Sequence, residues 1–313
     1  MLLSNLEYAN IAKLTADEQE IAADKFWRNI TKNKTPSSKK QLIILVGQPG
    51  SGKSTLADKC QQKNSNLVCV GGDDILKYHP RLFQMAQARP VRLNSKMRDC
   101  YDDPVFSNPN QDPLDYNNGE RYLEEFAHDT YIKTVCGLFE QGYDVLIDAL
   151  PGDEAKAFAT LGHRLGYSVN VVAAVVPKQI SDSNIVKRYE KGAMLFNEAI
   201  AGKREQSAEN VPHTYNRLRQ HPDDLEDAKK FLLDIVKSGF ALQVVNPINK
   251  TTIGEGANGA LAYLPEIKRT DLSAAEQELI TSRYTDIASM QEKRNASKYD
   301  RILLNTVTKG YQK

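Results

Sequence analysis

The chain is 313 residues long, enough for one large or two ordinary domains, and its 41 Lys and Arg nearly balance its 40 Asp and Glu. This balance gives no global field that would draw the protein to nucleic acid or to a membrane, and no apolar run approaches the roughly 20 residues that cross a bilayer, so we expect neither as a partner. Because no basic segment with a long apolar core begins the chain, a cytoplasmic location is expected, or secretion by a machine that needs no such signal.

Residues 15–31 are predicted to form the first helix. Thr15 would be its N-cap, and Glu18 follows three positions later, as in a capping box. Its apolar side is expected to be made by Ile21, Ala22, Phe26, Trp27 and Ile30. Polar residues then lead to the first apolar run, so we expect residues 1–40 to be an N-terminal helical segment and linker.

A core of alternating strands and helices is expected over residues 41–250. The apolar runs that indicate strands are 42–46, 67–70, 145–147, 169–176 and 241–245. Helical patterns such as 121–141 separate them, and several runs are apolar throughout, which is typical of strands buried on both faces. The prediction is an α/β fold with a parallel sheet flanked by helices, whose ligands gather where the strands end.

Two segments fit this alternation poorly. Residues 99–119 are rich in Asp, Asn and Pro, so we expect a long loop inserted in the core, either folded over a substrate or a plain surface excursion. Residues 271–300 are predicted to form a charged helix that is capped by Asp271. Its apolar residues are Leu279, Ile280, Tyr284, Ile287 and Met290. We expect residues 251–313 to be a C-terminal helical extension packed on the core.

A phosphate-binding loop directly follows the first apolar run. The residues expected to bind ATP there are Gly47, Gln48, Pro49, Gly50, Ser51, Gly52, Lys53, Ser54 and Thr55. The glycines let successive N–H groups face one anion, in front of a helix whose first turn carries the positive end of its dipole. Lys53 would reach the terminal phosphates, and Ser54 would offer its hydroxyl to Mg²⁺. A glycine turn between strand and helix is the structural alternative.

Acidic residues follow the second apolar run. Asp73 is the best candidate for a catalytic base, which would accept the proton of an attacking hydroxyl and hold that group in line with the phosphate. The alternative is an N-cap of the next helix, a role that we assign to Asp74, which also counts among the substrate-binding candidates. His79, just before Pro80, is another substrate-binding candidate, with local packing of its ring as the alternative.

An acidic residue also ends the third apolar run. Asp148 would bind Mg²⁺ there, directly or through water, as an acidic residue at the end of a strand beside a phosphate loop commonly does. A helix cap or a hydrogen bond to the loop is the alternative. Together with Ser54, Asp148 makes up the expected metal site.

These motifs resemble those of the zeta toxin family of P-loop kinases. The family typically has a helix, an apolar strand and a Gly-Gln-Pro-Gly-Ala/Ser-Gly-Lys-Ser/Thr loop, then a Gly-Asp motif that ends in His-Pro. An apolar strand with an acidic end and a later Arg-Tyr usually follow. The matching parts of this chain are 15–30, 47–54, 72–80, 145–148 and 188–189. The resemblance spans about residues 15–250, and its most specific part is 47–80.

The resemblance implies an α/β kinase that moves the γ-phosphate of ATP onto a hydroxyl of a nucleotide-containing small molecule, such as UDP-N-acetylglucosamine or NAD, and so poisons a cell. By the family pattern Asp73 would be the base, Lys53 the phosphate lysine and Arg188 a phosphate-binding arginine. A rigid guanidinium fork on Arg188 would neutralise charge on the transferring group. The alternative for Arg188 is a surface arginine that is solvated or paired with Glu190. A neutralising antitoxin is also implied.

The chain departs from the family pattern at several positions. Leu76 stands where the family often has an arginine, and Leu150 stands where it commonly has a threonine that contacts the substrate. We keep Leu150 as a substrate-binding position. A second family arginine is matched most nearly by Lys203 and Arg204, which are expected to bind ATP. The functional alternatives are a polynucleotide kinase, which needs a basic groove, and a nucleotide-binding module without kinase chemistry that a partner protein reads.

Overall fold

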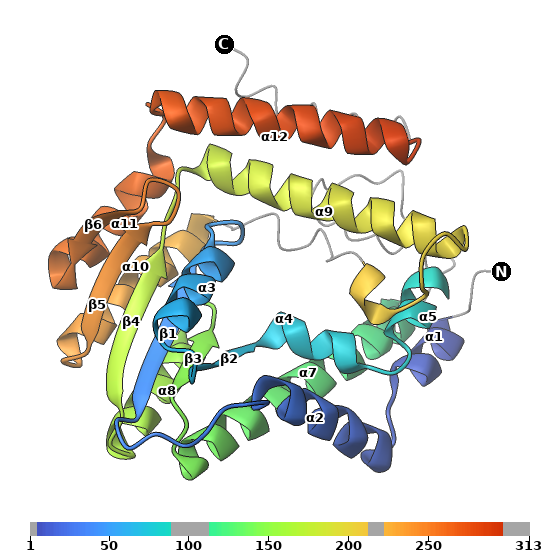
Figure 1. Cartoon of the computed structure of the whole chain (residues 1–313), viewed down its shortest axis with the longest axis horizontal. Helices are drawn as coiled ribbons and strands as arrows, with labels where there is room; N and C mark the ends of the chain where they lie inside the picture. Colours follow the sequence, from blue (N-terminus) through green and yellow to red (C-terminus); the bar gives the residue numbers. More distant parts are fainter. Residues whose placement is uncertain (1–4, 89–112, 212–221, 297–313) are drawn as a thin grey trace.

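The computed structural model describes residues 5–88, 113–211 and 222–296. A six-stranded sheet with the order β2-β3-β1-β4-β5-β6 lies at its centre (Figure 1). The strands are β1 (Gln41–Gly47), β2 (Val68–Gly71), β3 (Val145–Asp148), β4 (Ser168–Ala174), β5 (Ala241–Asn246) and β6 (Thr251–Glu255). All neighbouring pairs are parallel except β5 and β6, which are antiparallel. This confirms the α/β fold and the mainly parallel sheet.

Helices cover the sheet and extend beyond it. They are α1 (Asn5–Ala12), α2 (Ala16–Ile30), α3 (Lys53–Lys63), α4 (Gly72–Ile75), α5 (Leu82–Ala88), α7 (Pro113–Gln141), α8 (Asp153–Arg164), α9 (Lys178–Ile200), α10 (Pro222–Lys237), α11 (Gly256–Lys268) and α12 (Ala274–Lys293). The 3-10 turns η1 (Leu76–Tyr78) and η3 (Ala208–Asn210) follow α4 and α9. Within the described ranges, no helix combines the length and apolar character needed to cross a membrane.

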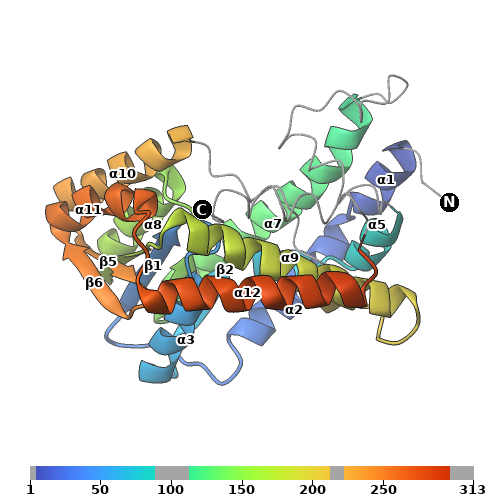
Figure 2. The same ribbon diagram turned by 90° about the horizontal axis from the view of Figure 1, so that it is seen from above.

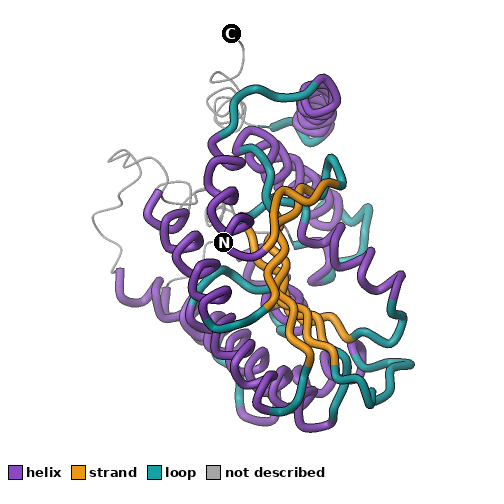
Figure 3. The backbone as a smooth tube through the Cα atoms, turned by 90° about the vertical axis from the view of Figure 1, so that its left-hand side faces the viewer, coloured by secondary structure: helices purple, strands orange, loops and turns teal. Residues whose placement is uncertain are grey.

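The central strands are apolar at successive positions because helices lie on both faces of the sheet (Figure 3). On β1, the side chains of Leu42, Ile44 and Val46 face a core shared with α2, α7, α8, α10 and α11. The alternate residues Ile43 and Leu45 pack against α3 on the opposite face. Since side chains alternate between the two faces of a strand, burial on both faces requires this unbroken apolar run.

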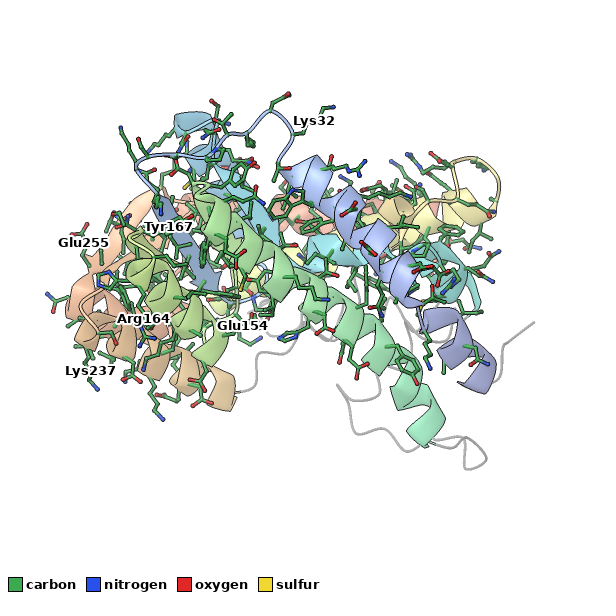
Figure 4. The ribbon with its side chains drawn as sticks, turned by 90° about the horizontal axis from the view of Figure 1, so that it is seen from below. Lys32, Glu154, Arg164, Tyr167, Lys237 and Glu255 are labelled. Atoms are coloured by element: carbon green, nitrogen blue, oxygen red, sulfur yellow. The ribbon has the colours of Figure 1, made fainter. Side chains whose placement is uncertain are left out.

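Polar contacts join α7 to α8 and to the turn that leads into β4. The hydroxyl of Tyr167 donates hydrogen bonds to the carbonyl oxygens of Leu138 and Phe139 on α7, at 3.3 Å each. Glu154, in the first turn of α8, lies 3.2 Å from Nε2 of His128 on α7. Figure 4 shows this side of the molecule, with Glu154 and Tyr167 labelled. These contacts hold α7 against α8 and against the start of β4.

Strand register brings the expected site residues to one edge of the sheet. Gly71 at the end of β2 is paired with Asp148 at the end of β3, and Leu45 of β1 is also paired with Asp148. Gly47 at the end of β1 is paired with Ala174 at the end of β4. The carboxyl ends of these four strands therefore lie side by side, as the ligand rule for parallel sheets requires.

The N-terminal helix confirms most of its predicted details. Thr15 caps α2 and forms the predicted capping box with Glu18. Ala22 and Phe26 are buried, but the side chain of Ile21 is 56% exposed and lies outside the packing face. The prediction that Asp271 caps the C-terminal helix is wrong. Ser273 caps α12 and forms a capping box with Glu276.

Two elements differ from the prediction. Residues 113–119 belong to α7, so the prediction of a loop over 99–119 is wrong for these residues, and residues 99–112 lie outside the described part of the chain. β6 was not predicted, because Thr251–Glu255 contains one strongly apolar residue, Ile253. It extends the sheet within the segment expected to be a C-terminal extension. The boundary at residue 250 remains a prediction.

Candidate active site

The phosphate-binding loop leaves β1 and enters α3 through glycines in backbone conformations that other residues rarely adopt. Gly47, Gly50 and Gly52 have φ angles of +147°, +72° and +92°. A Cβ atom on Gly47 would lie 2.3 Å from the carbonyl oxygen of Ala174, the paired residue on β4. The glycines therefore allow both the turn itself and its close approach to the neighbouring strand.

Helix α9 holds the loop from the other side. The side-chain amide of Asn184 donates a hydrogen bond to the carbonyl oxygen of Gly50 at 2.7 Å, and the hydroxyl of Ser181 donates one to the carbonyl oxygen of Pro49. In a trans peptide the N–H points away from the carbonyl. Because the Pro49 carbonyl faces α9, the Gly50 N–H points away from α9. No sequence pattern marks Ser181 and Asn184, which lie more than a hundred residues beyond the loop motif.

The side chains at the base of the loop are structural. Gln48 is 2% exposed and donates a hydrogen bond to the carbonyl oxygen of Val176 at 2.8 Å, and Ser51 is 1% exposed. Tyr263 of α11 is fully buried next to them. Burial raises the pKa of its hydroxyl, and the nearby Gln48 backbone N–H opposes this rise. The Ser51 backbone N–H donates a hydrogen bond to the Gln48 carbonyl oxygen at 3.1 Å, whereas the side chains of Ser54 and Thr55 are exposed on the first turn of α3.

Lys53 connects the loop to the carboxyl edge of β3. Its Nζ atom donates a hydrogen bond to the carbonyl oxygen of Gly47 at 3.0 Å and lies 3.7 Å from Oδ1 of Asp148. The lysine side chain is 14% exposed and that of Asp148 is 38% exposed. This cation therefore lies over the loop and beside the carboxylate expected to bind metal.

Three carboxylates gather at this edge. Burial raises the pKa of Asp148, Lys53 opposes the rise, and the nearby charges of Asp73 and Asp74 add to it. Asp73 and Asp74 are in α4, which starts directly after β2. The structure thus brings the expected base, the expected metal ligand and the phosphate lysine together, although they come from three separate segments of the chain.

Asp74 does not have the capping role expected of it. The N-cap of α4 is Gly71, with no side-chain hydrogen bond, and Asp74 instead accepts a hydrogen bond from Lys77 at 2.7 Å. Its side chain is 63% exposed, so it remains available as a substrate-binding candidate. Leu150 is 64% exposed, two residues beyond Asp148, and its apolar side chain is open to solvent at the same edge.

His79 is buried instead of open to a substrate. It is 2% exposed, its Nε2 lies 3.0 Å from the carbonyl oxygen of Ala12, and the Arg81 backbone N–H donates to its Nδ1 at 3.3 Å. Its ring also packs edge-on against Phe126, with the centroids 5.6 Å apart. These contacts support the packing alternative and leave no ring nitrogen for a substrate.

Arg81 ties the base-bearing segment to the N-terminal helices. Its guanidinium donates to the carbonyl oxygens of Ile11 and Lys13, at 2.8 and 2.9 Å, and pairs with Glu18. This pairing, together with the Thr15 backbone N–H, lowers the pKa of Glu18 to about 2. Arg81, which follows Asp73 in the chain, therefore contacts the capping box of α2 through Glu18.

Arg188 is exposed on α9, one helical turn beyond Asn184. Residues four apart lie on the same side of a helix, so Arg188 is on the side that holds the loop, about 6 Å further along the axis. Glu190, its suggested partner, is buried and paired with Arg294. The surface-pair alternative with Glu190 is thereby excluded.

Lys203 and Arg204 lie far from the phosphate loop. They follow the C-terminal end of α9, whereas Ser181 near its other end contacts the loop. At 1.5 Å per residue, the axis from Ser181 to Ile200 is about 28 Å long. Arg204 is paired with Glu198 at 3.2 Å. A continuous helix therefore carries these two residues away from the loop, and the structure does not bring them together with the other residues expected to bind ATP.

The residues expected to bind Mg²⁺ suit a site that the protein shares with the phosphates of a bound nucleotide. No group of three or more His, Cys, Asp or Glu side chains in the described part of the chain is arranged to hold a metal ion. Mg²⁺ usually keeps several waters and binds through one or two carboxylates plus substrate phosphates, so it does not need such a group. Asp148, half-exposed at the strand end, and Ser54, exposed on the first turn of α3, suit that arrangement.

Comparison with known proteins identifies the family. The family model described as Zeta toxin matches residues 25–99 and 110–250. The chain belongs to the zeta toxin family. This membership covers the loop, Asp73, Asp148 and Arg188, and agrees with the resemblance found in the motifs.

Individual zeta toxin relatives are distant in sequence. Toxin zeta of Streptococcus agalactiae is 24% identical over 185 residues, which cover 58% of this chain and 55% of that protein. Toxin PezT of Streptococcus pneumoniae serotype 4 is 24% identical over 216 residues, or 67% of this chain and 74% of that protein. A solved structure from the PezAT chromosomal toxin-antitoxin system of S. pneumoniae has a TM-score of 0.63 at 18% identity and covers 90% of this chain and 99% of that chain. That similarity establishes a shared fold.

Proposed function

We propose that this zeta toxin family member is an ATP-dependent kinase that phosphorylates a hydroxyl of a nucleotide-containing small molecule. The observation that carries the proposal is the convergence of Lys53, Asp73 and Asp148 beside a phosphate loop whose shape α9 maintains. A loop alone would serve any phosphate ligand. A carboxylate base at the same edge favours transfer to a hydroxyl.

Each residue has a defined part in the proposed reaction. The loop backbone binds the phosphates of ATP, and Lys53 neutralises charge on the terminal ones. Asp73 accepts the proton of the attacking hydroxyl as the new oxygen–phosphorus bond forms at the γ-phosphate. The bond from the γ-phosphorus to the bridging oxygen breaks and ADP leaves, while Arg188 stabilises charge on the transferring group. Mg²⁺, when bound, would neutralise the β- and γ-phosphates, with Asp148 and Ser54 as the residues that hold it.

The acceptor is proposed to be a nucleotide sugar such as UDP-N-acetylglucosamine, or NAD. Both offer sugar hydroxyls next to a charged diphosphate. Asp74 and Leu150 lie on the acceptor side, and the exposed Leu150 side chain would give an apolar contact to a ring where the family commonly has a threonine. Phosphorylation of either metabolite would be toxic to the cell that uses it. A neutralising antitoxin is proposed because a relative of the same fold comes from a toxin-antitoxin system.

Incubation of the protein with ATP and a cell extract, followed by mass spectrometry, tests the proposal. A metabolite heavier by one phosphate should accumulate, and purified UDP-N-acetylglucosamine and NAD should then be compared as acceptors. Asp73→Asn should lower transfer at least a hundredfold, as loss of a general base does, while ATP binding is retained. Asp58→Asn, an exposed position on α3, is the matched control and should keep full transfer.

The same assay distinguishes the alternatives. Phosphorylation of a labelled oligonucleotide in preference to small acceptors would indicate a polynucleotide kinase. ATP binding with no acceptor-dependent ATP consumption would indicate a nucleotide-binding module that a partner reads. Full transfer by the Asp73→Asn variant would refute the role given to that residue.

A further inference from the structure

Helix α12 lies alongside α9 over much of its length (Figures 1 and 2). Apolar side chains line the contact: Ile180 packs with Ile280, and Val186 packs with Ile287. Both helices therefore advance in the same direction along the contact. A parallel pair of this kind fixes both the tilt and the rotation of each helix, because side chains at helical spacing interlock.

Polar contacts follow the same register. The guanidinium of Arg283 donates to the Ser183 hydroxyl at 3.3 Å, and Lys187 pairs with Asp286 at 2.5 Å. Further along, Glu190 accepts hydrogen bonds from Gln291 and Arg294; Nε of Arg294 lies 2.6 Å from Glu190 Oε2. Contacts therefore extend beyond the apolar part toward the C-terminal half of α9.

The Glu190–Arg294 pair is the most enclosed of these contacts. The side chains are 1% and 8% exposed, whereas those of Lys187 and Asp286 are 41% and 48% exposed. A buried ion pair adds little net stability, because the loss of hydration offsets the attraction. It does penalise strongly any arrangement that separates its members, so it selects one relative position of two elements.

The opposite side of α9 carries the groups that face the active site. Asn184 contacts the phosphate loop, and Arg188 follows one turn later on that side. Further along, Phe196 packs on Phe83 of α5, with ring centroids 5.2 Å apart, in the segment that follows Asp73. A rotation of α9 about its axis would move Arg188 relative to the loop.

We propose that Glu190 is a positioning residue for phosphate transfer: paired with Arg294, the C-cap residue of α12, it fixes the rotation of α9 that directs Arg188 toward the phosphate loop. The proposal rests on the proposed function, since it assumes that Arg188 stabilises the transferring phosphate. It gives α12 a part in the reaction that is exerted through α9.

The first test compares kcat with ATP affinity. Glu190→Gln keeps the size of the side chain and its hydrogen bond with Gln291 but removes the charge that holds Arg294. The expected result is a fall in kcat of about tenfold or more, the cost of a misplaced catalytic group, with the Kd for ATP changed less than twofold. Glu198→Gln, in the exposed pair with Arg204 on the same helix, should leave both values unchanged. A kcat of Glu190→Gln equal to that of the wild type would overturn the proposal.

The second test asks whether the effect acts through Arg188. In an Arg188→Ala background, Glu190→Gln should lower kcat less than twofold further. An equal fold loss in both backgrounds would show that Glu190 acts elsewhere and would refute the positioning role. Wild-type transfer by Arg188→Ala alone would instead refute the role of Arg188 in the proposed function. If Glu190→Gln does not fold, as judged by thermal unfolding and ATP binding, Arg294→Lys decides the question by the same criteria, because it keeps the charge but not the guanidinium fork.

Discussion

Asn184 on α9 and Gly50 in the phosphate loop are joined by a 2.7 Å hydrogen bond across 134 positions of sequence. Gly50 is also so close to α9 that a Cβ atom on it would lie 2.5 Å from the carbonyl oxygen of Ser181. The loop therefore has its shape because of a helix far away in sequence, and ATP affinity should depend on residues that contact no phosphate.

Removal of the Asn184 amide should weaken ATP binding. Asn184→Ala leaves the Gly50 carbonyl without this donor, and we expect the Kd for ATP to rise about threefold to tenfold, the usual net value of one hydrogen bond. Isothermal titration of the purified variant with ATP measures this. Asn197→Ala removes the same side chain from an exposed position of α9 and should bind ATP like the wild type. An unchanged Kd for Asn184→Ala would show that the loop keeps its shape without α9.

Gly50→Ala should abolish ATP binding. The added methyl group meets the Ser181 carbonyl at 2.5 Å, so either the loop or α9 must move. Gly202→Ala is the matched control, because Gly202 has nearly the same φ, +71°, and no atom within 4 Å of the added Cβ. That control should show only the cost of the backbone angle, about 1–2 kcal/mol in the free energy of unfolding, and normal ATP binding. Equal losses of ATP binding in both variants would mean that the backbone angle, and not the contact, is decisive.

Asp148→Asn should raise the stability of the protein at neutral pH. It should also weaken Mg²⁺ binding, because it removes the carboxylate that is proposed to hold the ion. Burial raises the pKa of Asp148, so the folded protein holds this proton more tightly than the unfolded chain does. The protonated Asp148 carboxyl group therefore contributes to the stability of the fold at low pH. This contribution is lost as pH rises through the pKa that Asp148 has in the folded protein. The melting temperature of Asp148→Asn should exceed that of the wild type at pH 7, and the difference should shrink toward pH 4. A lower melting temperature at pH 7 would contradict this account, as would unchanged Mg²⁺ affinity in the presence of ATP.

Arg81→Met should change the acid stability of the protein. Pairing with Arg81, together with the hydrogen bond from the Thr15 backbone N–H, lowers the pKa of Glu18 from 4.5 to about 2, so these contacts stabilise the fold above pH 4.5 and their contribution is lost as pH falls toward 2. In Arg81→Met the dependence of unfolding free energy on pH over that window should become shallower, as urea denaturation would show. Arg28→Met removes an exposed pair with Asp24 and should leave the dependence as it is. The same slope in both variants would exclude Arg81 as the cause.

Local patterns predicted the parts of this fold that local chemistry determines. The strands β1 to β5 were found because each is an apolar run, and the phosphate loop because its glycines are needed at fixed spacing. The capping box at Thr15 and Glu18 was found for the same reason. β6 was missed because an edge strand needs little apolar surface, and its pairing with β5 provides the stability that its sequence does not.

The candidate site could be predicted only where its residues adjoin a motif. Asp148 ends β3 and Asp73 follows β2, so the edge of the sheet places them together. Ser181 and Asn184 were missed because their partners are backbone carbonyl oxygens, which any sequence provides. The burial of His79 cannot be predicted from the sequence, because its partner, the Ala12 carbonyl oxygen, gives no sequence signal either. Lys203 and Arg204 were misplaced because the sequence alone did not show that α9 continues unbroken to Ile200.

The hydrogen bonds from Ser181 and Asn184 also determine when the phosphate loop can take its final shape during synthesis. A ribosome releases the chain from its N-terminus, and domains fold as their segments emerge. The loop emerges long before Ser181 and Asn184, its partners 132 and 134 positions later, and Arg294 emerges later still. A partly made chain would thus expose the phosphate-binding motif without the helices that complete it. The phosphate-binding site would therefore be complete only after both α9 and α12 have been synthesised.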